Sequence, residues 1–129
     1  MNVKEICLCF LLSFLLFCNV MAETKFKTES SVLFENCNEA VAFLNKEIRE
    51  IKHWKVSACF GFMQGVRDVN VLYQDRKIEQ IYCLPPNISV GELSRVFVHY
   101  LKANPNSFHE PAIFSMVKAF NDSFVCEAL

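Results

Sequence analysis

Residues 59–68 read Cys59-Phe60-Gly61-Phe62-Met63-Gln64-Gly65-Val66-Arg67-Asp68, and this stretch decides the interpretation of the whole chain. Apolar residues recur here at steps of three or four, which is typical of one face of a helix. Gly61 and Gly65 lie one turn apart on another face. A glycine in a helix interior costs roughly 1 kcal/mol relative to alanine, so we expect the close approach of another backbone to compensate for both. The pattern predicts a central helix over 57–74 with a buried face of Cys59, Phe62, Val66, Val69 and Tyr73.

The first 22 residues have the pattern of a secretory signal peptide. Lys4 gives a positive n-region, residues 6–20 are almost entirely apolar, and Val20-Met21-Ala22 is a small-x-small cleavage site. A membrane span needs about 20 apolar residues, and this run is too short. We therefore expect cleavage after Ala22, which leaves residues 23–129 as one exported domain with no attachment to a membrane.

The composition argues against several functions. The net charge is −1 and no basic stripe is present, so nothing indicates a nucleic-acid partner. The chain has no Gly-x-Ser-x-Gly motif, phosphate-binding loop or His-Glu-x-x-His motif, and no histidine lies near a cysteine at metal-ligand spacing. We expect a protein that is not an enzyme and that holds no cofactor or metal. A cysteine–histidine nucleophile is the enzymatic alternative, and it requires a free thiol.

Four cysteines remain after residue 22, namely Cys37, Cys59, Cys83 and Cys126. An even number in a small exported domain is typical of two disulfides. The expected helices favour Cys83–Cys126, because these residues flank the two ends of a helical hairpin. Cys37–Cys59 is then left by elimination. Four cysteines allow three connectivities, so this pairing is one of three.

Helical patterns and end signals divide the rest of the chain. We expect a short helix through Phe34 that ends near Cys37, and a second, amphipathic helix over 39–53 with Asn38 as its N-cap. Trp54 is expected to close that helix onto the core. Ser89 and Glu92 form a capping box for a helix with an apolar face of Leu93, Val96, Phe97, Tyr100 and Leu101, which Asn104-Pro105 ends.

A last helix is expected to begin within 107–111, with a second capping box of Ser107 and Glu110. Its expected buried stripe is Ile113, Val117, Phe120 and Phe124. No segment alternates with a period of two for long enough to predict a strand. The sequence therefore predicts an all-α domain, a small bundle of four to five helices with two disulfides.

In order along the chain, these motifs resemble the Rap/Tai family of immunity proteins, which protect bacteria from type VI secretion amidase effectors. The resemblance covers about residues 30–126. The residues that carry it are Cys59-x-Gly61-Phe62-x-x-Gly65-Val66-x-Asp68, Cys83-Leu84-Pro85, Val90-Gly91-Glu92-Leu93, Tyr100-Leu101, Asn104-Pro105, His109-x-Pro111-Ala112 and Phe124-Val125-Cys126. It implies a small periplasmic protein that binds a papain-like peptidoglycan amidase and occludes its active site. Some members are dimers, so the resemblance also admits a homodimer.

Loops on a rigid scaffold commonly carry function, so the polar connection after the central helix is the candidate partner-binding segment. Its candidate residues are Gln74, Asp75, Arg76, Lys77, Glu79 and Gln80. Two other interpretations stay open, since a fold does not prove a function. One is a periplasmic chaperone like the Hde-type acid-stress proteins, in which histidines and carboxylates would respond to low pH. The other is an orphan exported interaction module without a toxin partner.

Overall fold

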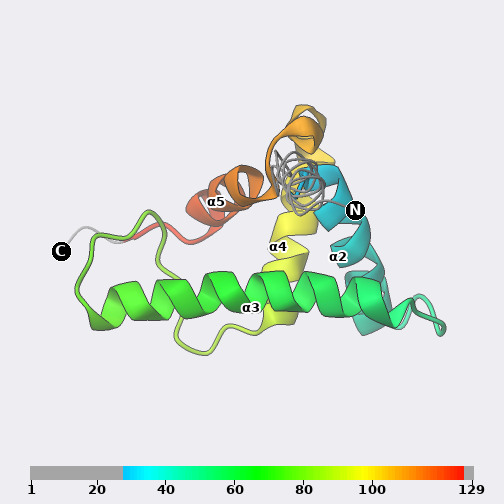
Figure 1. The fold of residues 1–129 in the computed structure, drawn as a ribbon, viewed down its shortest axis with the longest axis horizontal. Coiled ribbons are helices and arrows are strands. Elements are labelled where there is room, and N and C mark those ends of the chain that lie inside the picture. Colours follow the sequence, from blue (N-terminus) through cyan, green and yellow to red (C-terminus); the bar gives the residue numbers. More distant parts are fainter. Residues whose placement is uncertain (1–27, 127–129) are drawn as a thin grey trace, which may run out of the picture.

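The computed structural model describes residues 28–126, so the expected signal peptide lies outside the described residues. The described part is an all-α bundle without a β-strand (Figure 1). Its helices are α2 (Ser30–Leu44), α3 (His53–Asp75), α4 (Val90–Ala103), the 3₁₀ helix η2 (Pro105–His109) and α5 (Ala112–Ser123). No helix within residues 28–126 is both long enough and apolar enough to cross a membrane. The predicted fold class is confirmed.

Helix α3 is the longest element and extends beyond the other helices at one end. Helix α2 packs against both α3 and α4, and α5 packs mainly against α4 and α2. Figure 1 shows α3 as the long green helix, with α4 crossing behind it and α5 above its second half. The last turns of α3 therefore lie away from α2 and α4, beside the loop that follows them.

The N-terminal helix differs from the prediction. One continuous helix, α2, replaces the expected short helix and the expected helix over 39–53. The apolar period of Leu33, Cys37 and Ala40 passes through Asn38, and all three apolar side chains are buried. Asn38 therefore has no helix start to cap. The connection 45–52 turns back beside α2, where the Glu39 carboxylate accepts a hydrogen bond from the backbone N–H of Lys52.

Helix α3 also begins earlier than expected. It begins at His53, which places Trp54 in the first turn with 63% of its surface exposed, so the prediction that Trp54 closes a helix onto the core was wrong. Cys59 is buried, and Phe62 and Val66 are half-buried against the core. Val69 and Tyr73, also predicted to be buried, are exposed by 51% and 39%, because the buried face of this half of α3 passes through Met63 and Asn70 instead.

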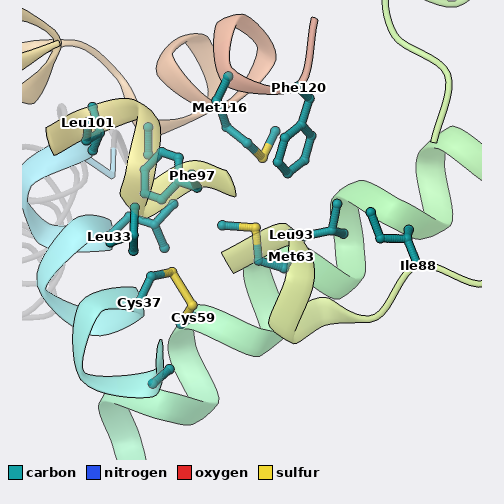
Figure 2. Close-up of a cluster of buried hydrophobic side chains, with 14 of the residues drawn as sticks. Leu33, Cys37, Cys59, Met63, Ile88, Leu93, Phe97, Leu101, Met116 and Phe120 are labelled. Atoms are coloured by element: carbon teal, nitrogen blue, oxygen red, sulfur yellow. A yellow bond between two sulfur atoms is a disulfide. The ribbon is translucent and has the colours of Figure 1, made fainter. Parts of the chain in front are cut away.

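The core lies where the four helices meet. Figure 2 shows Phe97 of α4 and Phe120 of α5 facing Met116 and the Cys37–Cys59 disulfide below them. These side chains and Met63 of α3 have no solvent exposure. The second disulfide joins Cys83 to Cys126 at the far end of the molecule. Both bridges have the pairing that the helical layout favoured.

Helix α4 follows its sequence signals closely. The Ser89 hydroxyl accepts a hydrogen bond from the backbone N–H of Glu92, and the Glu92 carboxylate accepts one from the backbone N–H of Ser89. The Ser89 hydroxyl also donates to the Glu92 carboxylate at 2.7 Å, and this hydrogen bond, together with the one from the Ser89 N–H, lowers the pKa of Glu92 below its usual value. On the predicted face, Leu93, Phe97 and Leu101 are fully buried and Val96 and Tyr100 are half-buried. The capping box and this face are confirmed.

The start of α5 was predicted less well. Ser107 lies in η2 and forms no capping box with Glu110, and α5 begins after Pro111 with no side-chain cap. The buried stripe contains Phe120, as expected, but Ile113 is exposed. Small side chains form most of the stripe. They allow α5 to come close to the N-terminus of α2, where Ser30 Oγ lies 2.7 Å from Ser115 Oγ. The buried residues of α5 are Ala112, Ser115, Met116, Ala119 and Phe120.

Candidate functional site

The candidate site consists of the last two residues of α3 and the connection that follows, residues 74–84 together, which we call the distal loop. It begins with a Schellman motif: the N–H of Ile78 donates to the Tyr73 carbonyl at 2.9 Å and the N–H of Lys77 to the Gln74 carbonyl at 3.1 Å. Lys77 takes the left-handed conformation that the motif requires, with φ of 54°. The loop thus leaves the end of α3 with a defined direction.

Amide side chains hold the loop against α3. Asn70, which is buried, donates from Nδ2 to the Tyr82 carbonyl at 3.1 Å. Gln80 Nε2 donates to the Asn70 carbonyl at 3.1 Å, and Gln74 Nε2 donates to the Leu84 carbonyl at 3.4 Å. Two of the six candidate residues, the half-buried Gln80 and the exposed Gln74, therefore hydrogen-bond to the backbone and serve to position the loop.

The other four candidates, Asp75, Arg76, Lys77 and Glu79, are exposed at the tip of the loop. Within residues 28–126 none of them forms an ion pair. Along the sequence, two basic residues lie between two acidic ones, so their formal charges cancel. Within residues 28–126 these side chains form no hydrogen bond either, so their charged groups are available to another molecule.

Two apolar residues of the loop were not among the sequence candidates. Ile78 is 48% exposed and Ile81 is 67% exposed. Large apolar side chains in an otherwise polar connection are a signal that could have identified them, since desolvated apolar anchors usually carry most of the energy of an interface. The structure places them in the same loop as the charged tip residues.

The base of the loop is closed by aromatic packing and a disulfide. The Tyr82 ring lies 5.4 Å from that of Phe120, which in turn lies 5.8 Å from Phe124. Burial raises the pKa of Tyr82, and the nearby Tyr73 raises it further. The N–H of Cys83 donates to the Phe124 carbonyl at 2.8 Å, beside the Cys83–Cys126 bridge.

Gly61 and Gly65 do not have the role that the sequence suggested. No atom would lie within 4 Å of a Cβ added at either position, so no second backbone approaches them closely. Both are exposed, and they line an open, mainly apolar groove of about 480 Å³ between α3, α5 and the distal loop. The groove residues are Gly61, Phe62, Gly65, Val66, Val69, Tyr82 and Ile113.

Replacing Gly61 and Gly65 with alanine, singly and together, is expected to stabilise the isolated protein. Alanine is favoured over glycine in a helix interior by about 0.8–1 kcal/mol, and the open space leaves no clash to oppose this gain. Urea unfolding followed by circular dichroism measures the change in the free energy of unfolding. A loss of stability in either single variant would contradict the open groove.

A matched pair of lysines tests the loop geometry. Lys46 after α2 and Lys77 after α3 both have positive φ in a Schellman motif, at 61° and 54°. The left-handed conformation costs a non-glycine residue about 1–2 kcal/mol, and glycine adds about 0.4–1 kcal/mol of unfolded-chain entropy. Lys46→Gly and Lys77→Gly should therefore each raise the free energy of unfolding by about 0.5–1 kcal/mol. Urea titrations of both variants measure this, and a loss would show that the motif is not formed.

The structure contains no group of side chains arranged for catalysis at the distal loop. Among residues 28–126, no three His, Cys, Asp or Glu side chains gather at a spacing suited to a metal ion. A second hollow of about 620 Å³ lies between the Pro85–Ile88 turn, α4 and Phe124, and it is lined by one acid, Glu92, and one base, Arg95. Neither of these two places has a nucleophile next to a base.

Comparison with known proteins assigns the chain to a family. A family model described as Rap1a immunity proteins matches residues 30–126. This range begins at the first residue of α2 and ends at Cys126, so it includes all the described helices and both disulfides. Searches of curated proteins and of solved structures found no match. Since the matched range covers most of the sequence, the chain belongs to the family of Rap1a immunity proteins.

Proposed function

We propose that this protein binds a peptidoglycan-cleaving amidase effector of a type VI secretion system and blocks its active site with the distal loop. The family is one of immunity proteins, and an immunity protein acts on a partner effector. The observation that carries the proposal is the division of the loop into an inward, hydrogen-bonded base and an exposed tip. The amidase class comes from the sequence resemblance to Rap/Tai proteins.

A loop held in one conformation is suited to tight inhibition. Binding costs free energy for every side chain and loop that must be ordered, and the distal loop is already ordered by Asn70, Gln74, Gln80 and the Cys83–Cys126 bridge. Ile78 and Ile81 offer apolar surface that a cleft would bury. The charged tip residues around them would set the orientation and the specificity.

The disulfides support a periplasmic location. Disulfides form and persist in oxidising compartments such as the bacterial periplasm, and both bridges of this chain join residues far apart in sequence. An amidase that cleaves peptidoglycan peptides has its substrate in that compartment. We therefore place the immunity function in the periplasm, after removal of residues 1–22 as a signal peptide.

The experiment begins by identifying the effector. The oxidised chain from Glu23 to Leu129 is tagged and incubated with extract of its source organism, and retained proteins are identified by mass spectrometry. One cell-wall amidase in near-stoichiometric amount is the expected result. Many unrelated proteins retained only at low pH would instead favour the chaperone alternative and reject the proposal.

Variants of the loop then test the mechanism on the captured amidase. Arg76→Glu/Lys77→Glu is expected to weaken inhibition at least about tenfold, which is 1.4 kcal/mol of binding. The melting temperature should fall only slightly, because both side chains are exposed and form no ion pair within residues 28–126, and the cost is limited to reversing two charges at the C-terminal end of α3. Inhibition of peptidoglycan hydrolysis is measured against the concentration of each variant.

The matched control is Arg49→Glu/Lys52→Glu, which makes the same change of charge in the exposed connection at the opposite end of α3. It should inhibit like the wild type. Equal inhibition by the Arg76/Lys77 variant would reject the loop as the inhibitory element. Gln74→Ala/Gln80→Ala should weaken inhibition and also lower the melting temperature, because these amides hold the loop base.

A further inference from the structure

The two disulfides differ sharply in their access to solvent. Cys37 and Cys59 have no exposed surface, and Cys59 Sγ lies 3.2 Å from the buried Ser94 Oγ. Cys83 and Cys126 are only half-buried. A thiol can attack a disulfide only if it reaches one of the sulfur atoms. In the folded protein, the bridge of the distal loop is therefore the more accessible of the two, with Gln80 Oε1 3.5 Å from Cys83 Sγ and the Gln80 carbonyl 4.0 Å from Cys126 Sγ.

The two bridges also hold different kinds of structure. Cys37–Cys59 joins the middle of α2 to α3 inside the hydrophobic core (Figure 2). Cys83–Cys126 joins the base of the distal loop to the chain that follows α5, and Figure 1 shows these two segments together at the far end of α3. Breaking the second bridge removes no buried core contact, because neither cysteine belongs to the hydrophobic core.

We propose that Cys83–Cys126 is a site of thiol–disulfide exchange with an external dithiol, which opens the base of the distal loop while the core bridge stays oxidised. One thiolate of the dithiol attacks a sulfur of the bridge, forms a mixed disulfide and releases the other cysteine as a thiolate. The second thiol of the reagent then attacks the mixed disulfide and releases the remaining cysteine. The protein gains two electrons and two protons, and the dithiol becomes a disulfide.

Exchange at this bridge has a defined structural consequence. Once the Cys83–Cys126 bond is broken, the hydrogen bond from the Cys83 N–H to the Phe124 carbonyl is no longer reinforced by a covalent link. Only noncovalent contacts then hold residues 124–126 against the loop. The hydrogen bonds from Asn70 and Gln80 remain, so the loop loosens at its base without unfolding. If the distal loop is the inhibitory element, reduction lowers the affinity for the effector, and this consequence alone rests on the proposed function.

The exchange is tested on the folded, oxidised protein with no effector present. The chain is incubated with increasing dithiothreitol, or with reduced thioredoxin as a protein dithiol, then alkylated with iodoacetamide and analysed by peptide mass spectrometry. Cys83 and Cys126 should be alkylated at least about tenfold faster than Cys37 and Cys59, because access limits the attack on a buried bridge. Reaction with dithiothreitol but not thioredoxin would assign the exchange to small thiols.

Equal alkylation of all four cysteines, or reduction of Cys83–Cys126 only after the helices melt, would overturn the proposal. Hydrogen exchange gives a second readout: after selective reduction, and in Cys83→Ser/Cys126→Ser, the Cys83 amide should exchange faster than in the oxidised protein and faster than the amides of α2 and α4 in the same sample. An unchanged Cys83 amide would reject the opening of the loop. Since neither readout uses the effector, failure here leaves the proposed immunity function standing, and failure of the inhibition assay leaves this exchange site standing.

Discussion

Phe97→Ala is expected to lower the free energy of unfolding by about 3–5 kcal/mol, the range for removing a buried aromatic side chain. Phe97 lies on α4 with no exposed surface, in a cluster that includes Leu33 of α2, Met63 of α3 and Met116 of α5 (Figure 2). Four helices therefore lose packing from one substitution, and they cannot all collapse toward the cavity. Urea unfolding followed by circular dichroism measures the change.

Phe114→Ala is the matched control, because it removes the same side chain from a position on α5 that is 59% exposed. Its cost should stay below about 1 kcal/mol, as is usual for surface substitutions. If Phe97→Ala does not fold, Phe97→Leu retains most of the volume and should cost about 1–1.5 kcal/mol. Similar losses for Phe97→Ala and Phe114→Ala would show that α4 does not face the centre of the bundle.

The sequence was sufficient for the parts of the fold that local chemistry determines. Ser89 and Glu92 cap α4 through interactions within one turn, and the apolar face of α4 contacts other helices along its length. The cysteine pairing could also be predicted, because it depends on the order of the helices more than on their exact ends. These features need no information about distant contacts.

The errors arose where tertiary contacts override local signals. Asn38 looks like an N-cap, but the buried positions on either side of it lie on one helix face, so α2 continues. Val69 and Tyr73 continue the apolar period of α3, but the face that is covered in this half of the helix contains the polar Asn70, and apolar periodicity cannot identify a buried polar residue.

The sequence predicted where the candidate site lies, but it predicted the roles of the individual residues only in part. The polar segment after α3 is the distal loop, as expected, but Gln74 and Gln80 hold its base while Ile78 and Ile81 are exposed. Which amide turns inward depends on the carbonyls that the loop brings near it, and no local pattern encodes that. Two glycines one turn apart in a helix predict close packing of a second backbone against Gly61 and Gly65. In the structure no other backbone approaches either residue closely.

Removing the core disulfide with Cys37→Ala/Cys59→Ala is expected to cost about 4–5 kcal/mol. The bridge spans 22 residues, and loop closure of this length contributes about 3.4 kcal/mol in the chain-entropy model. The two sulfur atoms also leave a cavity in a site with no solvent exposure, which adds about 1 kcal/mol at roughly 24 cal/mol per Å³. Urea unfolding of the oxidised wild type and of the variant gives the difference.

Comparison with Cys83→Ala/Cys126→Ala separates the contribution of loop-closure entropy from that of the cavity. That bridge spans 43 residues, so chain entropy alone predicts a cost larger by about 0.6 kcal/mol than for the core bridge. Its cysteines are half-buried and lie outside the hydrophobic core, so little cavity is left. We therefore expect the shorter, buried bridge to be worth more than the longer one. The reverse order would mean that unfolded-chain entropy dominates both bridges and that the core closes over the missing sulfur atoms.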